Sequence, residues 1–252
     1  RKKIKPEAVA GADYIIHLAG ASIDRRWTLS NRIRIINSRV KSGLLLLDAI
    51  LNSPAKPKAF ISASAVGYYG TLTSDRIFSE TDEPATDFLG ETCKLWESVT
   101  TLFGKLGIRT VVLRTGIVLA PDGGAFRKIS MPVRLGISSP LGSGRQYMPW
   151  IHIDDLCAMY CKAIEDATMS GAYNAVAPEH VTNRKFMELL SKAMNKPFQF
   201  PSIPSFVLKM VFGEMSSILL KGSRVSSGKI SAAGYSFKYT NLEAAFAGLL
   251  KK

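Results

Sequence analysis

The stretch Asp13-Tyr14-Ile15-Ile16-His17-Leu18-Ala19-Gly20 decides how the rest of the chain is interpreted. Its apolar run is almost unbroken and stops at two small residues. Such a run predicts a strand that is buried on both faces, as in a parallel sheet. The small residues leave room for a ligand to lie against the backbone at the strand's carboxyl end, the edge at which open α/β sheets bind ligands.

Two later stretches have the same form. Residues 60–64, Phe-Ile-Ser-Ala-Ser, end in small polar side chains, and residues 111–116, Val-Val-Leu-Arg-Thr-Gly, end in Arg, Thr and Gly. Because parallel strands present their carboxyl ends at one edge of a sheet, we predict three strands that deliver their last residues to a shared site. The alternative, three unrelated core strands, stays open at this point.

Composition sets limits on the class of protein. The chain has 252 residues, of which 46% are apolar, enough for one large α/β domain or for one domain with a smaller cap. No stretch approaches the ~20 apolar residues of a membrane span, and the first residues show no secretion or transit pattern. The three cysteines are an odd number without a C-x-x-C pair, which argues against a disulfide framework and against a metal site. We expect a cytoplasmic protein without a membrane partner.

The formal net charge of +13 has three possible explanations. One is simply a basic surface, and another is a polyanionic ligand such as a phosphorylated cofactor or a nucleotide sugar. The third is nucleic acid, but the basic residues are scattered and form no basic motif interleaved with aromatic residues. We therefore expect no nucleic-acid partner.

Apolar periodicity predicts the remaining elements. Thr28 is a candidate cap for a long helix that ends before Pro54. The apolar face predicted for this helix consists of Ile33, Ile36, Val40, Leu44, Leu47 and Leu51. Further helices are expected at 88–104, 125–135, 155–167, 181–195 and 242–250, strands at 108–114 and 172–176, and short helices between 198 and 220.

Four segments, in order along the chain, carry a family resemblance: Ile16-His17-Leu18-Ala19-Gly20, Ser62-Ala63-Ser64-Ala65-Val66-Gly67-Tyr68-Tyr69-Gly70, Leu113-Arg114-Thr115-Gly116-Ile117-Val118-Leu119 and Gly142-Ser143-Gly144-Arg145-Gln146 with Trp150-Ile151-His152-Ile153-Asp154-Asp155-Leu156. Together they resemble the extended short-chain dehydrogenase/reductases, and more narrowly the atypical YfcH-type branch of the epimerase family. Arg26-Trp27, Ser38-Arg39 and Phe212-Gly213-Glu214-Met215 are further marks of that branch. The likeness covers essentially the whole chain.

The resemblance implies an α/β fold, a Rossmann-type doubly wound parallel sheet with a small, mostly helical C-terminal substrate or cap region. Residues 1–140 would form a truncated dinucleotide-binding domain, and residues 141–252 a mixed region that returns to the sheet and adds the cap. The glycine-rich turn that opens such folds is not in the given sequence, and by comparison with the usual βαβ length about 50–60 residues are missing. We expect the full-length protein to bind a nicotinamide dinucleotide, NADP or NAD, and the given stretch to bind it weakly or not at all.

By the same resemblance, small residues at the strand ends let the backbone approach the cofactor, and arginines reach its phosphate or ribose. For Arg34 and Arg39 the alternative is a solvated position on a helix face. The cofactor-binding residues implied are Leu18, Ala19, Gly20, Arg34, Arg39, Ser62, Ala63, Arg114, Thr115, Gly116 and Val118.

The catalytic residues depart from the family's pattern. Typical members use serine, tyrosine and lysine, the last two as Y-x-x-x-K on a helix. The corresponding positions here are Leu89 and Cys93, and neither can transfer a proton or supply a positive charge. Ser64 remains at its expected place, and Tyr68 or Tyr69 is the candidate acid/base, with aromatic packing in the loop as the alternative.

For the substrate, the resemblance implies contacts from Arg145, since a guanidinium suits a diphosphate, and from His152. The alternative for His152 with Asp155 is that they orient the loop and cap the helix. Two functions are carried forward. The first is an NAD(P)-dependent oxidoreductase or epimerase acting on a nucleotide sugar or related small molecule, and the second is a dinucleotide-binding sensor or interaction protein without turnover. The resemblance leaves a monomer or a homodimer open.

Overall fold

The computed structural model of the protein describes residues 4–5, 7–121, 123–198 and 201–250. The chain forms two compact units. Unit 1 consists of Arg1–Gly70, Glu83–Arg114 and Tyr160–Tyr173, and unit 2 of Thr71–Asp82, Thr115–Met159 and Asn174–Lys252. The domain division predicted between residues 140 and 141 stays a prediction, and the two units are described one at a time.

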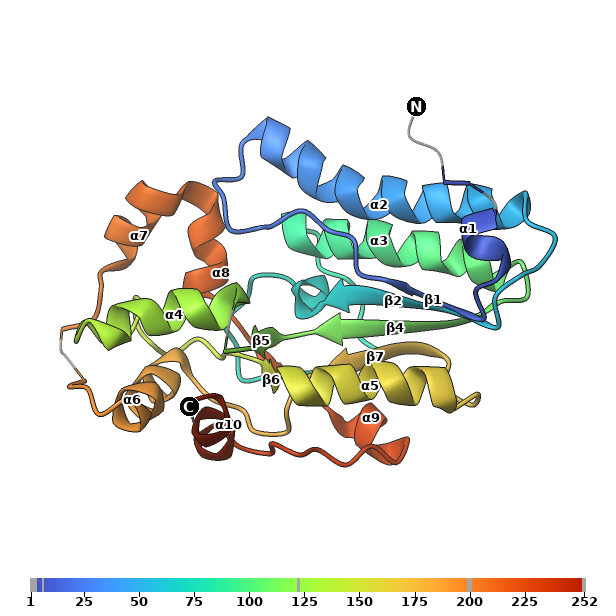
Figure 1. Ribbon diagram of the computed structural model, residues 1–252. Coiled ribbons are helices and arrows are strands. Elements are labelled where there is room, and N and C mark those ends of the chain that lie inside the picture. Colours follow the sequence, from blue (N-terminus) through green and yellow to red (C-terminus); the bar gives the residue numbers. More distant parts are fainter. Residues whose placement is uncertain (1–3, 6, 122, 199–200, 251–252) are drawn as a thin grey trace. The chain divides into compact units, whose positions relative to one another are not determined.

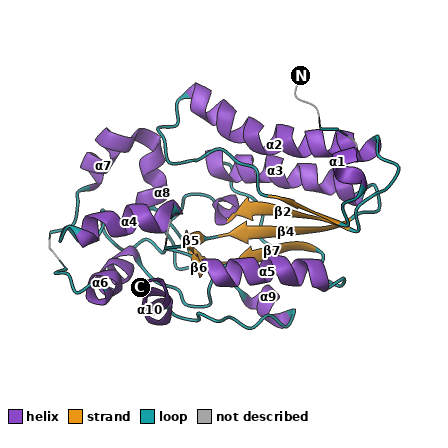
Figure 2. Ribbon diagram, in the orientation of Figure 1, coloured by secondary structure: helices purple, strands orange, loops and turns teal. Residues whose placement is uncertain are grey.

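Unit 1 is built on a four-stranded sheet of order β1-β2-β4-β7. The strands β1 (Tyr14–His17) and β2 (Ala59–Ala65) are followed by β4 (Arg109–Thr115) and β7 (Gly171–Ala175), the last two of which continue into unit 2. β1 and β2 pair in parallel, with His17 opposite Ser62. The arrows of β2, β4 and β7 point the same way in Figure 2. The predicted parallel α/β sheet is therefore confirmed.

Helices α2 (Leu29–Leu51) and α3 (Phe88–Gly104) lie over one face of this sheet (Figure 1). Side chains fix where both helices begin: the Thr28 hydroxyl accepts a hydrogen bond from the Asn31 amide, and the Asp87 carboxylate accepts one from the Gly90 amide. The two helices approach closely at Gly43, where a Cβ atom would lie 2.8 Å from Cγ1 of Val99. The predicted cap at Thr28 and the predicted helix at 88–104 are confirmed.

The core of unit 1 lies between these helices and the sheet. Phe60 of β2 stacks on Phe103 of α3 with ring centroids 3.7 Å apart and an interplanar angle of 8°. The rest of this cluster consists of Val9, Ile15, Ala49, Ile50, Val99 and Ile108. Val9 comes from the short helix α1 (Glu7–Ala10).

Two expectations about burial are wrong. β1 is buried on one face only: Ile15 and His17 are buried, while Ile16 on the alternate face is 41% exposed. The predicted apolar face of α2 is also displaced, since Ile33 and Leu44 are exposed. The residues of α2 that are buried are Ile35, Gly43, Ala49 and Ile50. At Gly43 the close approach of Val99 on α3 selects a residue without a side chain, which apolar spacing alone does not indicate.

Unit 2 is mainly helical, which confirms the prediction of a helical C-terminal region. Two short parallel pairs join distant segments: β5 (Ile117–Leu119) pairs with β6 (Trp150–His152), and β3 (Ile77–Phe78) pairs with β8 (Arg224–Val225). The α-helices are α4 (Gly124–Arg134), the first part of α5 (Ile153–Glu165), α6 (Asn183–Ala193), α7 (Ser205–Phe212), α8 (Ser216–Leu220), α9 (Gly228–Ala232) and α10 (Leu242–Leu250). Thr182 caps α6, and its hydroxyl accepts a hydrogen bond from the Lys185 amide.

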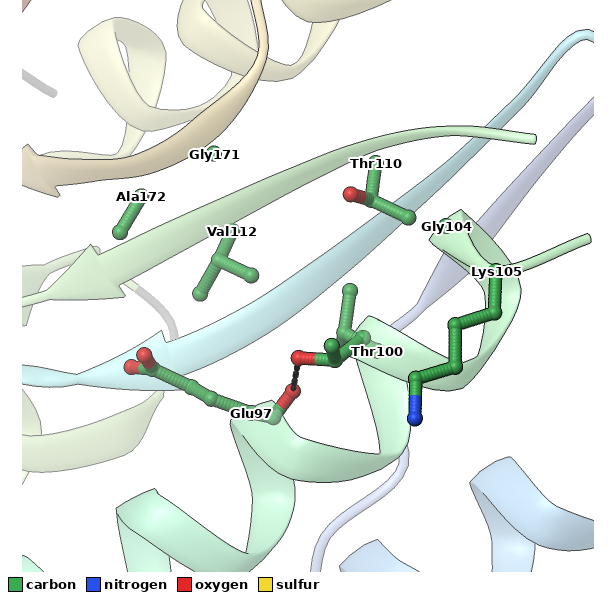
Figure 3. A pocket seen from close by; sticks show the side chains of 9 residues that line it. Glu97, Thr100, Gly104, Lys105, Thr110, Val112, Gly171 and Ala172 are labelled. Atoms are coloured by element: carbon green, nitrogen blue, oxygen red, sulfur yellow. Dashed lines mark hydrogen bonds between the residues drawn. The ribbon is translucent and has the colours of Figure 1, made fainter. Parts of the chain in front are cut away.

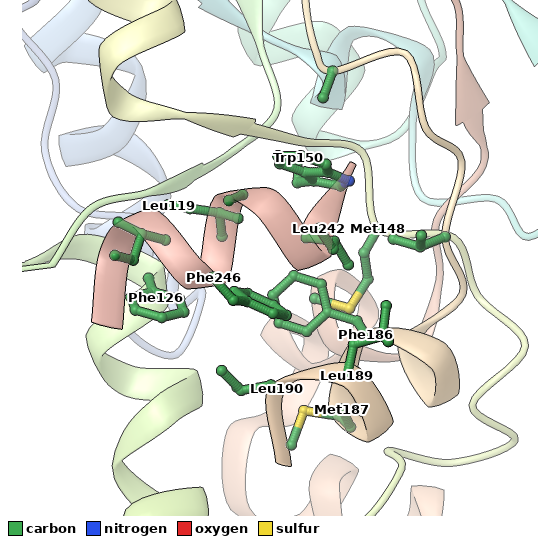
Figure 4. Packing of buried hydrophobic residues seen from close by; sticks show 14 of the residues in the cluster. Leu119, Phe126, Met148, Trp150, Phe186, Met187, Leu189, Leu190, Leu242 and Phe246 are labelled. Carbon is green, nitrogen blue, oxygen red and sulfur yellow. The ribbon is translucent and has the colours of Figure 1, made fainter. Parts of the chain in front are cut away.

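The core of unit 2 gathers aromatic side chains from separate helices (Figure 4). Phe246 of α10 stacks on Phe126 of α4 with ring centroids 5.9 Å apart, and meets Phe186 of α6 edge-on at 5.2 Å. Trp150 of β6 is fully buried in the same cluster. Among the residues described, no helix combines the length and apolar character that crossing a membrane requires.

Candidate functional site

The carboxyl ends of β1 and β2 form an open edge of unit 1. The pairing of His17 with Ser62 places the residues that follow β1 beside the end of β2. Leu18 is 62% exposed, and Ala19 and Gly20 are exposed after it. The structure thus brings together five residues predicted for cofactor binding: Leu18, Ala19, Gly20, Ser62 and Ala63.

Arg39 of α2 holds the loop that follows this edge. Its Nη1 donates to the carbonyl oxygens of Ala21 at 3.1 Å and Ile35 at 3.0 Å, and its guanidinium lies 4.9 Å from the centroid of the Trp96 ring. A Cβ atom on Gly20 would lie 3.1 Å from Cζ of Arg39, so the guanidinium lies directly against the glycine. Burial lowers the pKa of Arg39 from its ordinary value. Arg39 is therefore tied to the loop and is not a solvated helix-face residue.

Arg34 occupies a different place on the same helix. Its side chain is exposed, and it has no ion pair with another residue in the described part of the chain. Its predicted role in cofactor binding stays a prediction, and the solvated position is the simpler account of what the structure shows.

A buried polar cluster lies at the carboxyl end of β2. The Ser64 hydroxyl donates to Oε1 of Glu97 at 2.6 Å. Arg114 of β4 donates through Nε to Oε1 and through Nη2 to Oε2 of the same carboxylate, both at 2.9 Å. Their side chains are largely buried, Arg114 at 5% and Glu97 at 15% exposure. Arg114 and Glu97 thus form a bidentate ion pair, the geometry in which guanidinium and carboxylate bind most strongly, and Ser64 bonds to the same carboxylate.

Two tyrosines complete the cluster. Nη1 of Arg114 donates to the Tyr69 hydroxyl at 3.0 Å, and the Arg114 guanidinium lies 3.4 Å from the centroid of the Tyr68 ring. Burial raises the pKa of Tyr68 more than the charge of Arg114 lowers it. Burial by itself would lower the pKa of Arg114, but hydrogen bonds and charge from Glu97 outweigh it and raise that pKa. At neutral pH the cluster therefore holds a charged Arg114 and a protonated Tyr68.

Leu89 and Cys93 face this region from α3. A Cβ atom on Gly67, in the short helix η1 (Val66–Tyr69), would lie 3.3 Å from Cβ of Leu89 and 3.8 Å from Sγ of Cys93. Burial, reinforced by the negative charge of Glu97, raises the pKa of Cys93 to about 12. The thiol is therefore neutral at physiological pH and supplies no positive charge.

The sequence analysis missed Glu97 as the partner of Ser64 and Arg114. A usable signal was present, because Arg114 is a charged residue in an otherwise apolar strand, and a buried charge requires a counter-charge. On α3, Glu97 lies one helical turn after Cys93 and two turns after Leu89. The place of Glu97 on the helix could be worked out from the sequence, but its contact with Arg114 could not.

A shallow groove of about 390 Å³ lies along α3 and the neighbouring strands (Figure 3). Glu97 is at one end, and Lys105, Thr110 and Gly171 line it further along. Apart from Glu97 and Lys105, its lining consists of threonine, valine, alanine and glycine residues, without the convergent charges of the Ser64 cluster. We assign it no part in the chemistry.

His17 gives unit 1 a testable pH dependence. Its Nε2 lies 2.8 Å from Oγ of Ser42, its Nδ1 accepts from the Trp96 indole, and burial together with Arg39 lowers its pKa below the ordinary 6.5. The unfolded chain therefore binds the proton more strongly than the folded one, so the contribution of His17 to stability is present above pH 6.5 and is lost as pH falls below it.

We expect the free energy of unfolding, measured by urea denaturation across this pH range, to fall as the solution is acidified below about pH 6.5. The His17→Gln variant should show a smaller slope over the same range, because glutamine keeps a donor towards Ser42 but does not titrate. Identical slopes for the two proteins would mean that His17 is not responsible.

In unit 2, close packing of the backbone explains why a glycine follows β4. The Gly116 amide donates to the Ala175 carbonyl at 3.1 Å, and a Cβ atom on Gly116 would lie 2.6 Å from the Pro149 carbonyl oxygen. Close backbone packing therefore requires a glycine here. Val118 lies in β5 opposite Ile151. Contacts from Thr115, Gly116 and Val118 to a cofactor stay predictions.

Two residues predicted for the substrate also lie in unit 2. Arg145 is exposed, and its side chain forms no ion pair with another residue that the structure describes. His152 is 4% exposed, accepts a hydrogen bond from the Asp154 amide at 3.1 Å and packs on Tyr239 with ring centroids 3.8 Å apart. Arg145 is therefore accessible to a ligand, and His152 is placed inside the unit.

Asp155 has a structural role. Its Oδ1 accepts from the Tyr235 hydroxyl and the Lys238 amide, each at 2.8 Å, and its Oδ2 accepts from the Tyr239 amide at 3.0 Å. Asp155 thus holds the segment between α9 and α10, which agrees with the alternative that this part of the chain orients a loop.

Comparisons with known proteins agree with this fold. Residues 5–175 match the NAD dependent epimerase/dehydratase family, and residues 203–249 match a domain of unknown function. An epimerase family protein of Staphylococcus epidermidis is 37% identical over 246 residues, which cover 96% of this chain and 81% of that protein.

Two solved structures are similar over nearly the whole chain. The human epimerase family protein SDR39U1 (isoform 2), crystallised with NADPH, has a TM-score of 0.89 and 33% identity, covering 98% of this chain and 86% of that one. The nucleoside-diphosphate sugar epimerase of Corynebacterium glutamicum has a TM-score of 0.78 and 31% identity, covering 97% of this chain and 47% of that one. The chain therefore belongs to the NAD dependent epimerase/dehydratase family, as an atypical extended short-chain dehydrogenase/reductase.

Proposed function

We propose that this protein binds a nicotinamide dinucleotide, NADP or NAD, along the carboxyl edge of β1 and β2. We propose further that it acts as an NAD(P)-dependent oxidoreductase or epimerase on a small molecule such as a nucleotide sugar. The observation that carries the proposal is the Ser64–Glu97–Arg114 cluster, which lies at the same end of β2 as the open edge. Family membership and the NADPH of the human relative support the cofactor.

The open edge fits a flat, extended ligand. Ala19 and Gly20 are exposed and present little more than backbone, so a ring or a ribose can lie against them. Arg39 fixes the loop at Ala21 and brings a positive charge to Gly20, which favours a phosphorylated ligand. Leu18 adds an exposed apolar surface on the same side. Thr115, Gly116 and Val118 remain proposed contacts of unit 2.

The cluster favours proton donation over proton removal. The raised pKa of Tyr68 keeps its hydroxyl protonated at neutral pH, so it can donate a proton to a substrate oxygen. The Ser64 hydroxyl donates its hydrogen bond to Glu97, so the serine oxygen can accept a hydrogen bond and orient a substrate hydroxyl. Arg114 stabilises negative charge that develops on Tyr68. The nicotinamide, when bound, supplies or accepts the hydride.

For the substrate, Arg145 is the candidate contact. Its exposed guanidinium suits the diphosphate of a nucleotide sugar. The relative from Corynebacterium glutamicum carries a nucleoside-diphosphate sugar in its name, which supports this class. We keep His152 as a second proposed contact.

A second function, dinucleotide binding without turnover, is favoured by one specific observation. The position that holds lysine in typical members is Cys93, whose buried thiol stays neutral at physiological pH. Without that positive charge nothing at this position lowers the pKa of a catalytic tyrosine, so the tyrosine is a weaker base at neutral pH. In this case the protein would respond to the cofactor as a sensor or as an interaction partner.

Two measurements on the full-length protein test these alternatives. Calorimetry with NADPH and with NADH should show binding of one or both. Absorbance of the reduced nicotinamide, followed with candidate nucleotide sugars and small carbonyl compounds, should then show hydride transfer. Failure to bind either dinucleotide would refute both functions, and binding without transfer for any substrate would favour the sensor.

We expect Arg39→Ala to weaken dinucleotide binding by about 1.5–3 kcal/mol, the usual contribution of a hydrogen bond to a charged group. The loop after β1 loses its tether at Ala21, and the edge loses its positive charge. Thermal denaturation should show that the variant stays folded. Lys41→Ala is the matched control, because Lys41 is an exposed positive charge on the same helix. Equal dissociation constants for the wild type and Arg39→Ala would remove Arg39 from the cofactor site.

A further inference from the structure

Unit 2 exposes large apolar side chains that its core does not use. Near the end of α4, Met131 is 63% exposed, Leu135 71% and Ile137 56%. On α7, Phe206 is 70% exposed and Met210 is 69% exposed. Scattered single apolar residues on a surface are ordinary, but five on two neighbouring segments call for an explanation. We call these five residues the α4–α7 surface.

Backbone hydrogen bonds hold the two segments together. The Ile203 amide donates to the Pro140 carbonyl at 2.9 Å, and the Gly142 amide donates to the Ile203 carbonyl at 2.9 Å. Leu141 and Ile203 form a parallel bridge. The chain that leaves α4 is thereby fixed beside the chain that enters α7, and Figure 1 shows both helices within unit 2. The apolar side chains of the α4–α7 surface therefore belong to one region of the molecule.

The charged residues of helices α4 and α7 are all basic, namely Arg127, Lys128, Arg134 and Lys209. Asp122 and Glu214 lie just outside the two helices in the sequence. Arg127 and Arg134 are exposed on α4 together with Met131, at helical spacings of four and three residues. Lys209 is exposed on α7 next to Met210. Apolar and basic side chains on the same helix faces are the composition of helices that lie in the surface of an anionic bilayer.

We propose that the α4–α7 surface attaches the protein peripherally to an anionic lipid bilayer. Phe206, Leu135 and Met131 enter the boundary between head groups and acyl chains, and the arginines and Lys209 reach the lipid phosphates. The net charge of +13 adds long-range attraction to such a membrane. The proposal departs from the expectation of no membrane partner, which rested on the lack of a spanning segment, because a peripheral contact requires no such segment.

A second copy of the chain is the weaker candidate for this surface. A symmetric dimer would bring two sets of Arg127, Arg134 and Lys209 together, with no acidic side chain in either helix to offset them. An anionic lipid surface supplies the missing negative charge and accepts flexible apolar side chains without a matching shape. The chemistry of the region therefore favours lipid.

Sedimentation with vesicles tests the proposal on the full-length protein. The wild type should sediment with vesicles of phosphatidylcholine and phosphatidylglycerol, much less with phosphatidylcholine alone, and less at high salt. The double variant Leu135→Ser/Phe206→Ser should bind the anionic vesicles at least about tenfold more weakly for each side chain removed. Arg127→Gln/Arg134→Gln should lose most of the preference for anionic lipid.

The matched controls make the same kinds of substitution, apolar to serine and basic to glutamine, in unit 1. Leu44→Ser/Leu95→Ser removes two exposed leucines from α2 and α3, and Lys41→Gln/Lys105→Gln removes two exposed positive charges. Both controls should sediment like the wild type, and circular dichroism should show every variant folded. No binding of the wild type to anionic vesicles, or equal losses in the variants and the controls, would overturn the proposal. A dimer in analytical ultracentrifugation that Leu135→Ser/Phe206→Ser abolishes, without vesicle binding, would overturn it in favour of a second copy.

Discussion

Replacing Glu97 by leucine should lower the free energy of unfolding by about 3–5 kcal/mol, the usual result of removing one partner of a buried ion pair. The Arg114 side chain is 5% exposed and gives two hydrogen bonds to this carboxylate. Without Glu97 the guanidinium is left in a low-dielectric environment without its counter-charge, although the Tyr69 hydroxyl still accepts one hydrogen bond from it. Ser64 loses its acceptor at the same time. Urea denaturation of both proteins at neutral pH measures the difference.

Two comparisons make this result specific to the ion pair. Glu91→Leu changes the same residue type on the same helix, but Glu91 is 47% exposed and lies 3.9 Å from Lys94, so the loss should stay below about 1 kcal/mol. The double variant Glu97→Leu/Arg114→Met removes both charges and should regain most of the lost stability. Equal losses in Glu97→Leu and Glu91→Leu would show that the pair contributes little.

Replacing Tyr68 by phenylalanine should reduce turnover by about 10²–10⁴-fold, the range of a general acid. The Tyr68 ring centroid lies 3.4 Å from the Arg114 guanidinium, whose charge can stabilise the phenolate left behind. Cofactor affinity should change little, because the residues of the β1 edge are untouched. Steady-state kinetics on a substrate found by the absorbance assay, together with calorimetry, separates the two effects.

Tyr69→Phe is the matched control for this experiment. Tyr69 accepts a hydrogen bond from Nη1 of Arg114, so its loss should appear mainly as reduced stability, by about 1.5–3 kcal/mol, and less in turnover. Turnover that survives Tyr68→Phe and Tyr69→Phe together would mean that the proton comes from another group or from water. The role assigned to Tyr68 would then be abandoned.

The pH dependence of turnover offers a second view of the same residue. Because the pKa of Tyr68 is raised above its ordinary value, its protonated form persists through neutral pH and into the alkaline range. For the proposed activity we therefore expect the rate of carbonyl reduction to persist through neutral pH and to fall only in the alkaline range, which the absorbance assay repeated at a series of pH values measures. Because the Ser64 hydroxyl donates to Glu97, its oxygen would accept a hydrogen bond from the substrate hydroxyl during the proposed reaction.

The sequence predicted the regular elements well where the signals are local. The bounds of α3 and α10 agree with the predicted helices at 88–104 and 242–250, because a capping residue and an apolar period lie within the segment itself. The apolar runs of β1, β2 and β4 likewise identified the strands and their shared edge. Motifs spread over the whole chain indicated the epimerase family, and the comparisons confirm this membership.

The burial of individual faces could not be predicted in this way. The run Tyr14 to Leu18 is apolar enough for a strand covered on both faces, but Ile16 of β1 is exposed. In α2 the packed residues include Gly43, chosen by the approach of Val99 and not by apolarity. Which face is covered depends on a neighbour that lies far away along the chain.

The sequence by itself determined the strands that end at one edge, the small residues at that edge, the serine of the cluster and the absence of the usual tyrosine and lysine at positions 89 and 93. Only the tertiary structure decided that Ser64 bonds to Glu97 across 33 residues and that Arg114 bonds to it across 17. It also turned Arg39 towards the backbone of Ala21. The physical reason is that a hydrogen bond between side chains depends on where α3 packs on β2 and β4, and that packing is set by the whole core and not by any one segment.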